Sequence, residues 1–137
     1  MNIYETETGT DHITSFVVMP KHLNDNNLIF GGEMMSRLDE AAYISVKRLL
    51  RQSDCDTSVT VKTENAFHRG AKLGDIVVIR SRIQAMGTKS ITIKVAAWID
   101  HNDDGMLKKS DATYVFVSFK DGIPTPHKLP QMEQDNG

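Results

Sequence analysis

Hydrophobic and polar positions follow two different periods along the chain. In residues 31–53 the apolar side chains recur at steps of three and four, the period of a helix packed along one side. They are Met34, Met35, Leu38, Ala41, Ala42, Val46 and Leu49. The polar residues at 52–54 end this segment. The pattern predicts one amphipathic helix of about 20 residues, ~30 Å long.

The remaining apolar segments have the alternation or the β-branched composition of strands. We predict strands over residues 12–19, 58–67, 75–85, 90–99 and 112–119, with turns at 70–74, 86–88 and 101–109. Residues 20–30 hold three asparagines and an aspartate and predict a loop. A strand, a helix and four more strands predict an α+β fold, in which a five- to six-stranded antiparallel sheet wraps around one long central helix. Residues 12–126 form this single domain, between a flexible N-terminal tail (1–11) and a C-terminal tail (127–137).

Composition narrows the class of protein. The chain has 137 residues, with 16 Lys and Arg against 18 Asp and Glu, and a net charge of −2. Binding to a nucleic-acid backbone is disfavoured because it needs clustered cations. The single cysteine suits a reducing compartment. No targeting segment and no apolar run of about 18 residues is present, so we expect a cytoplasmic protein that neither crosses nor binds a membrane.

Metal and cofactor motifs are absent from the sequence. The five histidines are scattered, with no pair at metal-ligand spacing. Cys55 lies in a polar turn and is interpreted as incidental rather than nucleophilic. Phosphate-loop and dinucleotide fingerprints are missing as well. We therefore expect neither a metal site nor a cofactor.

Gly31 and Gly32 open the predicted helix, where backbone N–H groups are unpaired and the helix dipole is positive. Glycine lets a ligand atom approach such a backbone closely, so this corner could stabilise an oxyanion. The simpler alternative, favoured on spacing alone, is that the two glycines only shape a tight corner.

Asp39 lies at the border of the apolar stripe. A carboxylate there is either functional or a solvated residue paired with a nearby cation. Seven residues of helix separate it from Gly32, or ~10.5 Å, so it cannot easily reach a carbonyl held at its own helix start. An antiparallel helix from a second copy could bring its Asp39 to this Gly32. A shared site would therefore lie at a dimer interface.

Three other positions carry weaker signals. Asn24 could orient a water or a substrate carbonyl, although turn formation is the preferred reading for an asparagine standing alone. Gly87, Thr88, Lys89 and Ser90 join two strands and offer a flexible backbone, two hydroxyls and a cation, which suit a phosphate but also suit any hairpin. Arg69 could bind a phosphate or form a solvated strand end.

Together these residues resemble a known family. The segment MPKHLNDNNLIFGGEMMSRLDEAA closely resembles the signature of hotdog-fold acyl-CoA thioesterases of the cytosolic acyl-CoA hydrolase type. Asn24, Gly31-Gly32 and Asp39 match its Asn, Gly-Gly and Asp. The resemblance continues through residues 66–69, 74–75, 87–90 and 121–126, and covers roughly residues 13–130.

The resemblance implies a homodimer of hotdog subunits, commonly a trimer of dimers, that hydrolyses fatty acyl-CoA to a free acid and CoA. Asp39 would be the general base, or less readily a nucleophile. Asn24 of the other subunit would position the water or the thioester carbonyl, and the Gly32 N–H would hold the oxyanion. The CoA would lie near Gly31, Arg69 and the turn at residues 87–90.

The sequence departs from the family pattern at three positions. Asn27 stands where glycine is frequent, but asparagine also adopts left-handed turns. Gly70 stands where proline is usual, so we expect a looser corner. Glu33 stands where a large apolar residue is frequent; we expect it to face solvent, and it leaves the shape of the acyl pocket open.

Three other functions remain to be weighed. A non-catalytic acyl-CoA sensor or an assembly module would need neither a base nor a water-positioning amide. A hydratase would typically use a histidine on the helix, and none is present there.

Overall fold

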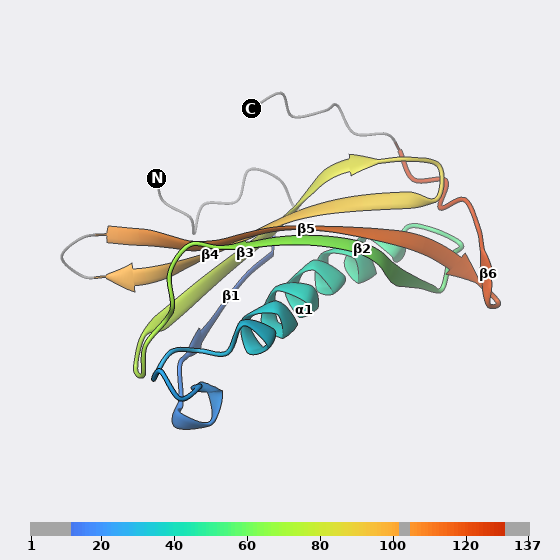
Figure 1. Cartoon of the computed structure of the whole chain (residues 1–137). Helices are drawn as coiled ribbons and strands as arrows, with labels where there is room; N and C mark the ends of the chain where they lie inside the picture. Colours follow the sequence, from blue (N-terminus) through green and yellow to red (C-terminus); the bar gives the residue numbers. More distant parts are fainter. Residues whose placement is uncertain (1–11, 102–104, 131–137) are drawn as a thin grey trace.

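The computed structural model describes residues 12–101 and 105–130. It contains one long helix and six strands, shown in Figure 1. The helix, α1 (Gly31–Leu50), follows a short 3-10 turn, η1 (Pro20–His22). The strands are β1 (His12–Val17), β2 (Thr57–Phe67), β3 (Ile76–Met86), β4 (Ser90–His101), β5 (Gly105–Lys120) and β6 (Ile123–Pro124).

The strands form one antiparallel sheet in the order β1-β3-β4-β5-β2, and β6 pairs with the end of β5. The sheet curves around α1, which lies along one of its faces (Figure 1). This is the predicted architecture. It arises because the apolar stripe of α1 can be buried only by strands about as long as the helix itself.

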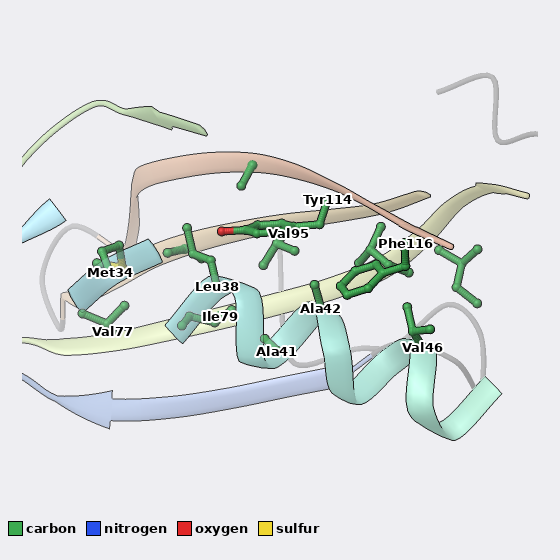
Figure 2. Close-up of a cluster of buried hydrophobic side chains, with 14 of the residues drawn as sticks. Met34, Leu38, Ala41, Ala42, Val46, Val77, Ile79, Val95, Tyr114 and Phe116 are labelled. Atoms are coloured by element: carbon green, nitrogen blue, oxygen red, sulfur yellow. The ribbon is translucent and has the colours of Figure 1, made fainter. Parts of the chain in front are cut away.

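The core lies between α1 and the inner face of the sheet, as Figure 2 shows. Met34, Leu38, Ala41, Ala42 and Val46 carry the helical side, each at most 2% exposed. Alternate residues of the central strands meet them, among them Val77, Ile79, Val95, Tyr114 and Phe116. The three-and-four spacing of the sequence therefore identified the buried face of the helix.

The sheet differs from the prediction mainly at its hairpins. β4 continues to His101 and β5 begins at Gly105, so much of the predicted charged turn at residues 101–109 is strand. Long antiparallel pairing overrides the polar composition there. The two predicted tails differ in outcome. Residues 1–11 lie outside the described part of the chain, whereas His127 and Leu129 are buried, so the packed domain continues past residue 126.

Within the described ranges, no helix is long and apolar enough to span a bilayer.

Candidate active site

The start of α1 offers backbone donors without a side-chain cap. Phe30 is the residue before the helix, and its side chain makes no capping hydrogen bond. A side chain added at Gly31 or Gly32 would meet nothing within 4 Å, and neither glycine has a positive φ. The corner itself therefore needs glycine at neither position. The open space beside the free N–H groups favours a ligand or a second subunit over the simpler reading of a tight corner.

Asn24 lies in the loop that leads into this helix start. Its side-chain oxygen accepts the N–H of Asn26 at 2.9 Å and that of Leu28 at 3.2 Å. The turn reading is thus correct for the oxygen. The side-chain nitrogen has no partner within the described part of the chain, so the amide N–H₂ remains available to a ligand. Asn27 has φ 60°, the left-handed turn expected of it.

A cluster of polar side chains ties this loop to the helix. The His22 ring is buried, and its Nδ1 accepts the N–H of Met19 at 2.9 Å, so the neutral ring carries its proton on Nε2. That Nε2 lies 3.7 Å from Oε1 of Glu33, which also accepts from Nε of Arg37 at 3.3 Å. Arg37 covers the Phe16 ring at 4.5 Å. The expectation that Glu33 simply faces solvent is wrong, because it links the helix to the loop that carries Asn24.

A cavity of about 360 Å³ opens beside Asn24 and Gly31. Its lining comes from the loop, the helix start, the end of β2 and β5: Asn24, Leu28, Ile29, Gly31, Met34, Phe67, His68, Arg69, Gly70 and Ser110. The predicted looseness at Gly70 is not seen. A side chain at Gly70 would meet Leu28 Cδ1 at 2.7 Å, so Leu28 fills this corner. The volume is within the range of small-molecule sites.

Asp39 lies farther along α1, exposed to solvent, and faces β2. Its Oδ1 accepts a long hydrogen bond from Oγ1 of Thr60, at 3.4 Å. It does not line the cavity, as the helical distance predicted. One chain therefore brings Asn24, Gly31 and Arg69 together but leaves Asp39 apart.

Tyr114 is a neighbour of Asp39 that sequence reasoning missed. It is 2% exposed, and its hydroxyl lies 3.2 Å from both the Met35 carbonyl and Oδ1 of Asn65. In the α-helix, the Met35 carbonyl is also the acceptor for the backbone N–H of Asp39, four residues later. Burial raises the pKa of Tyr114 and the Asp39 charge adds to this rise, while side-chain hydrogen bonding with Thr63 and Asn65 opposes it. A signal was available, because a tyrosine in an apolar strand needs a partner for its hydroxyl.

The turn at residues 87–90 lies at the opposite end of α1 from the loop at residues 20–30 (Figure 1). The Gly87 N–H donates to the Ser90 carbonyl at 2.9 Å, which closes a tight hairpin. Thr88 and Lys89 are exposed. Within one chain this turn is therefore remote from Arg69, the other residue expected near CoA.

Cys55 lies away from the cavity beside Asn24 and Gly31, near the C-terminal end of α1. Cys55 is buried, with its Sγ 3.5 Å from the Thr125 carbonyl and 3.6 Å from that of Pro126. Among the residues that the structure describes, no three His, Cys, Asp or Glu side chains gather as metal ligands would.

Comparison with known proteins agrees with this fold and its signature. A family model described as the thioesterase superfamily matches residues 26–106. The chain is 31% identical over 116 residues to the acyl-CoA thioester hydrolase YciA of Salmonella typhimurium, covering 80% of this chain and 84% of that protein. It is 30% identical over 122 residues to an uncharacterized acyl-CoA thioester hydrolase of Buchnera aphidicola, covering 86% and 88%.

Solved structures give the same result. A hexameric thioesterase from Yersinia pestis superposes with a TM-score of 0.74 at 28% identity, covering 85% of this chain and 93% of that one. An acyl-CoA hydrolase from Staphylococcus aureus, solved with butyryl-CoA, CoA and CoA disulfide, has a TM-score of 0.82 at 23% identity, covering 93% and 76%. The second likeness shows the fold alone. These matches confirm the predicted hotdog fold, and the chain belongs to the thioesterase superfamily, in the family of the acyl-CoA thioester hydrolases.

Proposed function

We propose that this protein is an enzyme that hydrolyses fatty acyl-CoA thioesters to a free acid and CoA, at a site shared by two subunits. The observation that carries the proposal is the division of the signature within one chain. The open helix start and the free Asn24 amide line one cavity, whereas Asp39 is exposed elsewhere on the same helix. Relatives named as acyl-CoA thioester hydrolases support the choice of substrate.

The edge of the sheet supports pairing with a second copy. β2 is an edge strand of 11 residues, and Val59, Val61 and Phe67 on it are 46%, 56% and 46% exposed. An exposed edge strand offers its unpaired backbone groups, here beside these apolar side chains, to another strand or subunit. Hexameric thioesterases among the structural neighbours are consistent with a trimer of such dimers.

A twofold axis at this edge makes the paired β2 strands and the adjacent helices antiparallel. Asn24 and Gly32 of one subunit then face the partner's Asp39. The same twofold rotation would bring the turn at residues 87–90 of one subunit to the same end of the dimer as Arg69 of the other subunit. Residues of both subunits would thus hold the CoA, and Gly31 would border the thioester.

In the proposed reaction, the Asp39 carboxylate takes a proton from a water molecule that Asn24 of the other subunit positions. The water oxygen bonds to the thioester carbon, and the Gly32 N–H and the helix dipole stabilise the resulting oxyanion. Collapse of this intermediate breaks the C–S bond, and the proton moves from Asp39 to the CoA sulfur. The less favoured course has Asp39 attack the carbonyl directly, forming an anhydride that water then cleaves.

Thiol release from acyl-CoAs of increasing chain length tests the proposal. The wild type should release CoA, and Asp39→Ala should lose about 10²-fold or more in kcat, since it lacks the base. Glu40→Ala is the matched control, because Glu40 is an exposed carboxylate on the next residue of the helix. Binding of acyl-CoA without thiol release would instead support the sensor.

A further inference from the structure

Hydroxyl groups on two strands of the sheet donate hydrogen bonds to backbone carbonyls of α1. Tyr114 of β5 reaches the Met35 carbonyl at 3.2 Å, and Ser81 of β3 reaches the Ala41 carbonyl at 3.0 Å. Both donors are buried in the core. In an α-helix, the Met35 carbonyl also accepts the backbone N–H of Asp39. The Tyr114 bond, unlike the Ser81 bond, is therefore made to the carbonyl that holds a proposed catalytic residue.

Tyr114 also lies on the side of α1 where the Asp39 carboxylate is found. Its position on β5 pairs with Thr63 of β2, and Oγ1 of Thr60 on the same strand lies 3.4 Å from Oδ1 of Asp39. Burial raises the pKa of Tyr114 and the negative charge of Asp39 raises it further, so the hydroxyl stays protonated beside the carboxylate. Ser81 approaches the helix from β3, which is two positions away from β5 in the sheet.

The Tyr114 hydroxyl faces a second acceptor, Oδ1 of Asn65, also at 3.2 Å. A tyrosine hydroxyl has one proton, so the bond to Asn65 competes with the bond to Met35. The Asn65 amide nitrogen donates to Oγ1 of Thr63 at 2.8 Å, which holds this side chain on β2. Removing the Asn65 side chain would therefore leave the hydroxyl free to donate to the helix alone.

We propose that Tyr114 is a positioning residue for Asp39. Its hydroxyl holds the Met35 carbonyl, and with it the helical turn that leads to Asp39, at a fixed distance from β5. In the proposed reaction the Asp39 carboxylate must meet a water held by Asn24 of the other subunit. A misplacement of about 1 Å can cost about 10²-fold in rate, so a small movement of this turn is sufficient. The inference rests on the proposed function, because it assigns a role within the same site.

Tyr114→Phe removes the hydroxyl and keeps the buried ring. The turn that carries Asp39 is then released from β5, so we expect kcat to fall by about tenfold. KM should change by less than about twofold, because the buried Tyr114 side chain acts through Asp39 and touches no substrate. In the Asp39→Ala background the same change should alter kcat by less than about twofold, since no carboxylate remains to be positioned.

Ser81→Ala and Asn65→Ala are the matched controls. Ser81→Ala removes the comparable bond to the Ala41 carbonyl, so it should lower the melting temperature while kcat stays within about twofold of the wild type. Asn65→Ala removes the competing acceptor and keeps the bond to Met35, so kcat should be retained. This variant tests the same bond without removing the hydroxyl, and it can contradict the inference even where Tyr114→Phe is unstable.

Thiol release is measured with the acyl-CoA that the wild type hydrolyses fastest, for each single variant and for Asp39→Ala with and without Tyr114→Phe. Circular dichroism and the melting temperature show which variants are folded. Unchanged kcat in Tyr114→Phe would overturn the inference, as would a further tenfold loss when Tyr114→Phe is added to Asp39→Ala. An equal loss of kcat in folded Ser81→Ala or Asn65→Ala would also overturn it. Failure of the wild type to release thiol from any acyl-CoA would instead overturn the proposed function, and this inference with it.

Discussion

Buried polar groups lie near both ends of α1, and the two ends differ in how these groups are hydrogen-bonded. At the N-terminal end, the Asn24 amide nitrogen and the Ser110 hydroxyl have no partner in the described chain. At the C-terminal end, residues 121–130, here termed the C-terminal arm, satisfy such groups. His127 of this arm is 1% exposed, and its N–H donates to Thr88 O at 3.2 Å. Ser53 donates to the His127 carbonyl at 2.7 Å.

The arm pairs further polar groups at this end, although the buried Ser58 hydroxyl there has no partner among the described residues. The His127 ring lies with Nε2 3.3 Å from Ser90 O, and its Nδ1 accepts the N–H of Leu129 at 3.1 Å. The Ser118 hydroxyl lies against the carbonyls of Lys89 and Thr125. The N-terminal end therefore keeps unpaired donors beside the proposed site, whereas the arm ties the C-terminal end together through paired groups. Substitutions at the open end should lower activity, and those at the closed end should lower stability.

The largest effect should follow Asn24→Asp. Aspartate keeps the oxygen that accepts from Asn26 and Leu28, so the turn survives. It removes the amide donor and adds a negative charge near the developing oxyanion. We expect a loss of about 10²-fold in kcat with little change in melting temperature. Asn26→Asp, at an exposed position of the same turn, should retain activity.

A loss of stability is expected next, at the closed end. Ser118 is fully buried, and Ser118→Ala removes a hydrogen bond between β5 and the arm or the turn at residues 87–90. The free energy of unfolding, measured in urea, should fall by about 2 kcal/mol. Ser15→Ala, on an exposed position of β1, should change it little. Loss of kcat in the folded Ser118→Ala protein would contradict the division between the ends.

Gly32→Ala should lower activity without lowering stability, because it adds a single methyl group at the helix start. The added methyl group meets nothing within the chain, and alanine favours a helix, so stability should hold or rise by up to about 1 kcal/mol. The same methyl group occupies the space proposed for the thioester, so kcat/KM should fall by about tenfold. In Gly87→Ala, the methyl group would lie 2.5 Å from Ser90 Oγ, so stability should fall. Full activity of Gly32→Ala would remove the helix start from the site.

The smallest effect concerns pH and a residue packed near the closed end. Burial lowers the pKa of His12 and the charge of Arg48 lowers it further, while Glu40 raises it. The folded chain therefore resists protonation of His12 below its ordinary pKa of 6.5. As the pH falls below this value, the unfolded chain takes up the proton first, so the free energy of unfolding decreases. His12→Asn should flatten this dependence slightly between pH 7 and pH 5; an unchanged slope would exclude His12 as its source.

The sequence predicted the elements with strong periods and missed contacts that only the fold creates. The helix and the long strands follow from runs of apolar positions, whose burial dominates local preference. The start of β5 at Gly105 was missed because charged residues there still pair across a long hairpin. Of the predicted site residues, Asn24, Gly31 and Arg69 line one cavity. Ser110 lines it as well but could not be predicted, because one serine in a strand has no distinctive pattern.

Glu33 shows a different limit of sequence reasoning. Glu33 was expected to face solvent, but it bonds to Arg37 and approaches His22, contacts that depend on the path of the loop. The proposal that two subunits share the site was made from helix length, since one helix cannot place Asp39 beside its own Gly32.

Mixing two inactive variants tests this shared site most directly. Asp39→Ala and Asn24→Asp chains, each with a different affinity tag, are coexpressed, and thiol release by the mixture is compared with that of each variant alone. A mixed dimer contains one site with both native residues, so random pairing should restore about a quarter of wild-type activity. Activity no higher than that of the two variants measured separately would contradict a site shared between subunits.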